Sequence, residues 1–137
     1  MTAEQVMEIL HSGGYSLVIW NNGIHIFTGR GVSDLYRIYN EQKGLLDGAV
    51  VADKIIGKGA AALMALGKVS EIITDTISSP ALSLLKTCGI PVSFQTVVPN
   101  FINRRGDSLC PVETLCLECA TPAECLPLIE GFMKEKK

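Results

Sequence analysis

The chain has 137 residues, which is the length of one compact domain whose core needs neither disulfides nor a bound metal. Hydrophobic residues make up 47% of the sequence and charged residues 19%, and this composition excludes an intrinsically disordered chain. The net charge of -2 argues against general nucleic-acid binding, because neutralising phosphates requires a positive surface. We therefore expect a single domain over residues 1–137.

The sequence predicts neither a membrane protein nor a secreted one. Its apolar runs are shorter than the roughly 20 residues that cross a bilayer. The segment before His11 carries two acids and no base, unlike a secretory signal. Five cysteines are an odd number for a disulfide framework, and a reducing compartment keeps them as thiols. We expect a soluble, cytoplasmic protein with no membrane partner.

The first third of the chain predicts a helix, a hairpin and a second helix. Apolar residues at helical spacing favour a helix over 3–11. Two short apolar runs flank 21–23, where Asn-Gly tolerates the positive backbone angles of a tight turn, so we expect a β-hairpin. A second helix is expected over 34–43, with Ser33 as its N-cap.

From residue 48 onward, short apolar strands alternate with helices. The pattern predicts strands over 48–53, 69–77 and 91–98, with helices over 54–67 and 79–89 between them. Ser79 is the expected N-cap of the second of these helices. A capping box at 121–124 opens a final helix that ends near residue 134. This alternation indicates parallel strands joined by crossover helices, so the fold class is α/β.

Open parallel sheets bind ligands beyond the carboxyl ends of their strands, where helix N-termini attract anions. The expected strand ends carry polar and basic residues that suit such a site: Asp53, Lys54, Lys58, Ser78, Ser79, Arg104 and Arg105. These residues indicate a small anionic ligand, such as a phosphorylated metabolite or a nucleotide. The alternative is that Asp53 caps a helix and that the lysines and arginines lie on ordinary solvated surfaces.

Two stretches of the sequence carry a resemblance to a known group of proteins, VVADKIIGKGAAALMALG and VSEIITDTISSPALSLLKTCGIPVSFQTVV. They resemble the cytidine-deaminase-like superfamily, and more narrowly a domain-of-unknown-function family of small prokaryotic proteins with that fold. The order of elements matches over residues 3–99. The resemblance implies a three-layer α/β/α fold with a mixed sheet.

The zinc chemistry of that superfamily is absent from the matching positions. Zinc deaminases use three His or Cys ligands and a glutamate that transfers protons. The first ligand position falls on Asp53 and the glutamate position on Ile55. The two cysteine positions fall on Ala81 and Leu84, which cannot bind zinc. We therefore expect no metal, no cofactor and no standard zinc-dependent deamination.

The narrower family implies a different set of catalytic candidates. Its signature segments resemble the stretches that hold Asp53, Lys54 and Lys58, and those that hold Cys110 and Glu113. If these segments face one another, a lysine binds an anion and Cys110 acts as a nucleophile, since a thiol at a helix N-terminus beside cations has a lowered pKa. The alternative is that Cys110 is a buried core residue and Glu113 a first-turn acid that the helix dipole favours.

Four cysteines fall close together near the end of the sequence: Cys110, Cys116, Cys119 and Cys125. Cys116 and Cys119 form a CxxC, but the outer cysteines are single, whereas structural zinc sites pair two such knuckles. The pattern therefore favours thiols packed in the core over a metal site.

These observations lead to three hypotheses about function. The first is a small-molecule-binding protein for an anionic, nucleotide-like ligand, on a deaminase-like scaffold without zinc ligands and with scope for a non-zinc activity. The second is a non-catalytic regulatory or interaction module, for which a second copy of the chain is a candidate partner. The third is a metal-binding enzyme that uses the C-terminal cysteine cluster.

Overall fold

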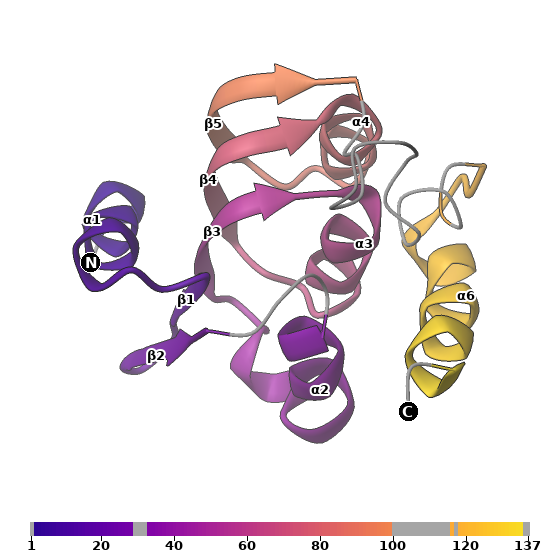
Figure 1. Ribbon diagram of the computed structural model, residues 1–137, viewed down its shortest axis with the longest axis horizontal. Helices are drawn as coiled ribbons and strands as arrows, with labels where there is room; N and C mark the ends of the chain where they lie inside the picture. Colours follow the sequence, from indigo (N-terminus) through magenta and orange to yellow (C-terminus); the bar gives the residue numbers. More distant parts are fainter. Residues whose placement is uncertain (1, 29–32, 100–115, 117, 136–137) are drawn as a thin grey trace.

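A five-stranded mixed sheet organises the chain, in the spatial order β2-β1-β3-β4-β5 (Figure 1). The computed structural model describes residues 2–28, 33–99, 116 and 118–135. Three of the strands are parallel neighbours, namely β3 (Val50–Ile56), β4 (Glu71–Ser78) and β5 (Val92–Val98). Two more extend the sheet in the antiparallel sense, β1 (Leu17–Trp20) and β2 (Ile24–Phe27).

The predicted hairpin is confirmed by the pairing of β1 with β2. Its turn contains Asn22 at φ 54° and Gly23 at φ 143°. Glycine adopts positive φ angles freely, and Asn adopts them more readily than most other residues. The Asn21 amide donates a hydrogen bond to the Gly23 carbonyl at 3.0 Å and closes the turn. The Asn-Gly sequence thus fixes where the chain reverses.

Helices cover both faces of the sheet. Figure 1 shows α1 (Ala3–Gly13) on one face, and α2 (Ser33–Glu41), α3 (Lys58–Leu66) and α4 (Ser79–Thr87) on the other. A short 3-10 turn, η1 (Lys43–Leu45), follows α2, and α6 (Pro122–Glu135) packs against α3 on the side away from the sheet. The α/β class and the three-layer arrangement are therefore confirmed.

Each face of the sheet buries its own apolar core. The core under α1 contains Val6, Leu10, Val18 and Ala52. The larger core lies between the sheet and the other helices, and α6 joins it through Cys125 and Ile129. Burial of these side chains, rather than helix propensity, supplies most of the stability of such short helices.

Two predicted boundaries are wrong. The helix expected from residue 54 begins at Lys58, with Gly57 as its N-cap, because β3 continues to Ile56. Ile55 and Ile56 pair with β4, and the sheet contacts outweigh the local helical pattern of this stretch. Asp53 consequently lies inside a strand, neither at the strand's carboxyl end nor at a helix cap.

The second correction concerns α4. Its N-cap is Ser78, whose hydroxyl oxygen accepts a hydrogen bond from the Ala81 amide at 3.3 Å, while Ser79 is the first helical residue and is exposed. Ser78 can fill this position because it is the last residue of β4 and keeps an extended backbone.

Three neighbouring strands interrupt their pairing at one level, which we call the strand break. Between β3 and β4, the residues on both sides of this level are paired, but Lys54 does not pair with Asp75. Between β4 and β5, Asp75 likewise does not pair with Gln95. As a result Val51 and Ile56 both reach the larger core, although regular alternation over five positions would place them on opposite faces. Ile72 and Ile77 of β4 show the same shift. The offset between paired residues is the same on both sides of the strand break, so none of the three strands carries an extra residue there.

Asp75 lies at the strand break and fastens α1 to the sheet. Both of its carboxylate oxygens contact Nε2 of His11, in the last turn of α1, at 2.9 and 3.0 Å.

Among the described residues no helix is long and apolar enough to span a membrane.

The N-cap assignment gives a direct test. Ser78→Ala should lower the free energy of unfolding by about 1 kcal/mol, because the first turn of α4 loses its side-chain cap. Ser79→Ala is the matched control and should change it by less than about 0.5 kcal/mol. Urea denaturation of the three proteins measures both values, and equal effects of the two substitutions would contradict the assignment.

Candidate functional site

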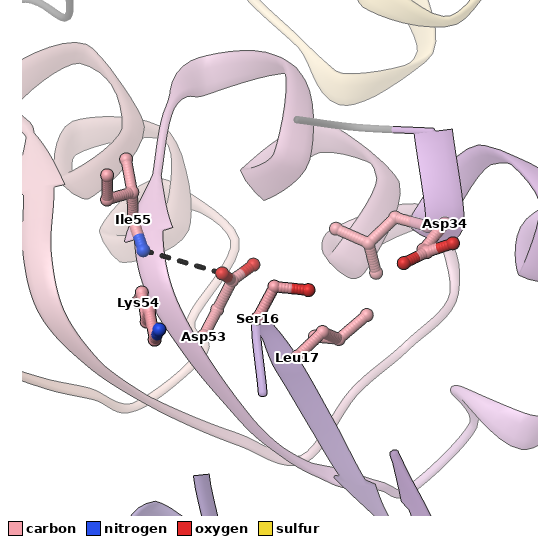
Figure 2. Close-up of a pocket in the computed structure, with 7 residues that line it drawn as sticks. Ser16, Leu17, Asp34, Asp53, Lys54 and Ile55 are labelled. Atoms are coloured by element: carbon pink, nitrogen blue, oxygen red, sulfur yellow. Dashed lines mark hydrogen bonds between the residues drawn. The ribbon is translucent and has the colours of Figure 1, made fainter. Parts of the chain in front are cut away.

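Asp53 lines a pocket of about 190 Å³ between β1, β3 and the start of α2 (Figure 2). The lining residues are Ser16, Leu17, Asp34, Leu35, Asp53, Lys54 and Ile55. Figure 2 shows the side chains of Ser16, Asp53 and Asp34 directed toward one shared space, while the Ile55 side chain points away from it. Three oxygen-bearing side chains from separate elements thus meet at one opening.

The strand break sets the orientation of the Asp53 carboxyl group. At this level the Ile55 amide turns toward its own strand and donates a hydrogen bond to Oδ1 of Asp53, at 3.4 Å (Figure 2). On the neighbouring strand, Leu17 lies directly opposite Asp53. The side chain that β3 presents to the pocket at this level is therefore an acid.

Burial raises the pKa of Asp53 from 3.8 to about 8. Removal of the carboxyl group from water is the largest cause. The amides of Ile55 and Lys54 oppose the shift by donating hydrogen bonds, and the negative charge of Asp34 adds to it. At neutral pH Asp53 is therefore mostly a neutral carboxylic acid, which can donate a hydrogen bond as well as accept one.

The other two oxygen-bearing side chains have defined partners. The Ser16 hydroxyl donates a hydrogen bond to the Phe27 carbonyl at 3.0 Å, so its oxygen is turned into an acceptor for further groups. Asp34 lies in the first turn of α2 and pairs with Nη2 of Arg37 at 3.1 Å. This wall of the pocket is consequently polar, with one acid that is countered by an arginine.

The other described residues of the predicted site lie elsewhere. Lys54 is exposed at the rim of the pocket. Lys58 is buried in the first turn of α3, and its Nζ donates a hydrogen bond to the Cys119 carbonyl. Ser78 is buried as the cap of α4, next to the exposed Ser79. The structure thus brings Asp53 and Lys54 to one pocket but not Lys58, Ser78 or Ser79.

Four further predicted residues lie outside the part of the chain that the structure describes: Arg104, Arg105, Cys110 and Glu113. Their roles stay predictions from the sequence.

The described cysteines of the C-terminal cluster pack together. Cys116 and Cys125 are buried, and Cys125 shares hydrogen bonds with Cys116 and Cys119. The hydrogen bond with Cys116 and, second, burial raise the pKa of Cys125 well above its ordinary range, and burial raises the pKa of Cys119 to about 11. The thiols of Cys119 and Cys125 therefore stay protonated at neutral pH. Within the described residues, no three His, Cys, Asp or Glu side chains are grouped closely enough to hold a metal ion.

The four residues that stand at the zinc-ligand and glutamate positions of zinc deaminases do not fit a zinc site. Asp53 and Ile55 lie inside β3 and not at a helix N-terminus. Ala81 and Leu84 are buried apolar residues of α4 with no ligand atom to offer.

Comparison with known proteins identifies the family. Residues 5–133 match the family described as Domain of unknown function (DUF1893), which is nearly the whole chain. The chain belongs to the DUF1893 family. A solved structure of a DUF1893 family protein from Thermotoga maritima (TM1506) is similar to it, with a TM-score of 0.86 and 26% sequence identity over 93% of this chain and 87% of that chain. The resemblance to a domain-of-unknown-function family is thereby confirmed, while the link to the cytidine-deaminase-like superfamily stays a prediction.

Other comparisons add little. Acinetobacter baumannii RibD, form 2, matches with a TM-score of 0.43 and 15% identity over 68% of this chain and 34% of that chain. Among curated proteins there is no match.

Sequence reasoning missed Ser16 and Asp34 as pocket residues of this DUF1893 protein. Both reach Asp53 because β1 pairs antiparallel with β3 and α2 follows the hairpin. The sequence predicts the hairpin, but contacts between distant segments decide that it pairs with β3. Ser16 directly precedes β1 in the sequence, and the strand order is needed to see that it lies beside Asp53.

The raised pKa of Asp53 predicts a pH-dependent stability. The carboxyl binds its proton more tightly in the folded chain than in the unfolded chain, so unfolding releases a proton between about pH 4 and pH 8. The free energy of unfolding should therefore fall as pH rises through this window, and Asp53→Asn should remove this part of the fall, which is on the order of a few kcal/mol.

Denaturant titrations from pH 4 to pH 9 measure this difference between the wild type and Asp53→Asn. The exposed Asp47 provides the matched control, because Asp47→Asn should follow the wild-type curve. Parallel curves for the wild type and Asp53→Asn would show that Asp53 titrates normally.

Proposed function

We propose that this chain binds a small, nucleotide-like molecule at the Asp53 pocket and that Asp53 exchanges a proton or a hydrogen bond with it. The observation that carries the proposal is a desolvated carboxyl group, with a pKa of about 8, that opens onto a pocket of about 190 Å³. Strongly perturbed acids in a concave site are over-represented among functional groups. Burying an acid without such a role costs stability, since an apolar residue would fill the same place more favourably.

The size of the pocket supports a ligand whose inserted part is a single ring. An apolar cavity of about 150 Å³ accommodates benzene, whereas sites for drug-sized ligands span roughly 300–1,000 Å³. A pocket of about 190 Å³ therefore suits one small ring, and the rest of a larger ligand would lie outside it.

The chemistry of the walls supports a heterocycle. A neutral carboxylic acid presents one donor and one acceptor side by side, which complements the adjacent donor and acceptor on the edge of a nucleobase. The oxygen of Ser16 offers a further acceptor on the same side. Asp34 disfavours a phosphate inside the pocket, and Lys54 at the rim supplies a positive charge for an anionic group that extends outward.

The pKa of Asp53 also supports a non-zinc activity. General acid–base catalysis is most efficient when the pKa of the group lies near the working pH, and about 8 meets this condition. Asp53 would then be the catalytic acid or base. Cys110 as a nucleophile, Glu113 as a second acid and the two arginines, Arg104 and Arg105, as anion-binding groups belong to this proposal on the sequence alone.

The interaction-module hypothesis has its own support in β5, an edge strand whose outer side pairs with no strand of the described residues. It is compatible with a ligand site at β3, since the two features lie on different strands.

Ligand binding is tested by thermal denaturation against nucleobases, nucleosides, nucleotides and inorganic phosphate. A ligand at 100 times its dissociation constant adds about 2.7 kcal/mol, which raises the Tm by several degrees. Asp53→Leu should lose most of this rise, because the aliphatic side chain has neither the donor nor the acceptor of the carboxylic acid, whereas Asp47→Leu should keep it. A panel without any shift, or an equal shift in Asp53→Leu, would contradict the proposal.

The substitution Lys54→Gln tests whether the anionic group of the ligand lies beside Lys54 at the rim of the pocket. The substitution should weaken the binding of a nucleotide roughly fivefold, by about 1 kcal/mol, and leave the matching nucleoside unchanged. Isothermal titration of both ligands gives this comparison. Equal losses for nucleoside and nucleotide would mean that Lys54 supports the pocket wall and does not face the phosphate.

A further inference from the structure

The strand β5 forms one edge of the sheet and is unusually exposed. β4 pairs with it on one side, and among the described residues no strand pairs with its other side. Five consecutive residues, 93–97, are exposed, and they include Phe94 and Val97, each at 41%. An edge strand offers a row of main-chain N–H and C=O groups that can pair with another strand.

Natural sheets usually protect such an edge with charges, proline or a very short strand. β5 has seven residues, none of them charged and none of them proline. The opposite edge, β2, has four residues and ends in the tight turn of the hairpin. The two edges therefore differ in length, and β5 is the one that can form the longer ladder.

The sequence of β5 suits pairing with itself. In an antiparallel pair centred on Gln95, this residue lies opposite the partner's Gln95, and Phe94 lies opposite the partner's Thr96. No like charges meet in this register, because the strand carries none. The two Phe94 rings become diagonal neighbours, and aromatic side chains reach across this distance. The small net charge of -2 also gives little repulsion between two copies.

We propose that two copies of this chain associate through β5, in antiparallel register about Gln95, so that their sheets join into one continuous sheet. The surface buried by one strand pair is at the small end of specific interfaces, so the dimer should dissociate on dilution. The pocket at Asp53 is separated from the joined edge by β4, and the association does not depend on ligand binding.

Sedimentation equilibrium over a wide concentration range tests the association. The wild type should show a monomer–dimer equilibrium. Gln95→Lys and Gln95→Glu each place like charges opposite each other, and each should raise the dissociation constant at least roughly fivefold. Mixing the two variants should restore a heterodimer, because Lys then faces Glu.

The matched control is Ile26→Lys, which adds a charge at an exposed position of the other edge and should leave the equilibrium unchanged. Far-UV circular dichroism of each variant establishes that it is folded. A wild type that stays monomeric at every concentration would overturn the proposal. Dimerisation of Gln95→Lys alone, or an equal loss in Ile26→Lys, would place the interface elsewhere and overturn it as well.

Discussion

The antiparallel pairing of β1 with β3 is the contact on which the rest of this molecule depends. It joins the N-terminal hairpin to the parallel strands and so sets the strand order. It places Ser16 and Leu17 beside Asp53, and the helix that follows the hairpin, α2, closes the same pocket with Asp34. It also forms part of the surface on which α1 packs, because α1 contacts both β1 and β3. Without this ladder, Ser16 and Leu17 would not lie beside Asp53 and the pocket would lose one of its walls.

The half-buried Asp53 places a carboxyl group where water reaches it poorly, and this lowers the stability of the fold. Two main-chain amides stabilise its charged form, yet burial and the nearby Asp34 outweigh them. The result is a proton held at neutral pH in a place where most acids would have lost it. Such a group destabilises the protein as pH rises, and stability exchanged for chemistry in this way is typical of functional sites.

Much of the fold was predictable because its signals are local. The Asn-Gly turn fixes the hairpin, and alternating apolar runs and helices specify the α/β class. The end of β3 was not predictable, since Lys54 to Ile56 read equally well as the first turn of a helix and only pairing with β4 decides between the two. Asp53 was recognisable as a candidate, but for the wrong reason: its importance comes from burial and the strand break, which no local pattern encodes.

The strand break has a consequence for how this chain can change its length. β3, β4 and β5 all skip a pair at one level, so their side chains stay in phase with one another on both sides of it. An insertion or deletion of one residue within any one of these strands would move its apolar side chains to the opposite face of the sheet from those of the neighbouring strands. Ile56 and Ile77 would then leave the core under the helices. Changes of length are therefore confined to the loops, and the acid that the strand break presents is held in place by three strands at once.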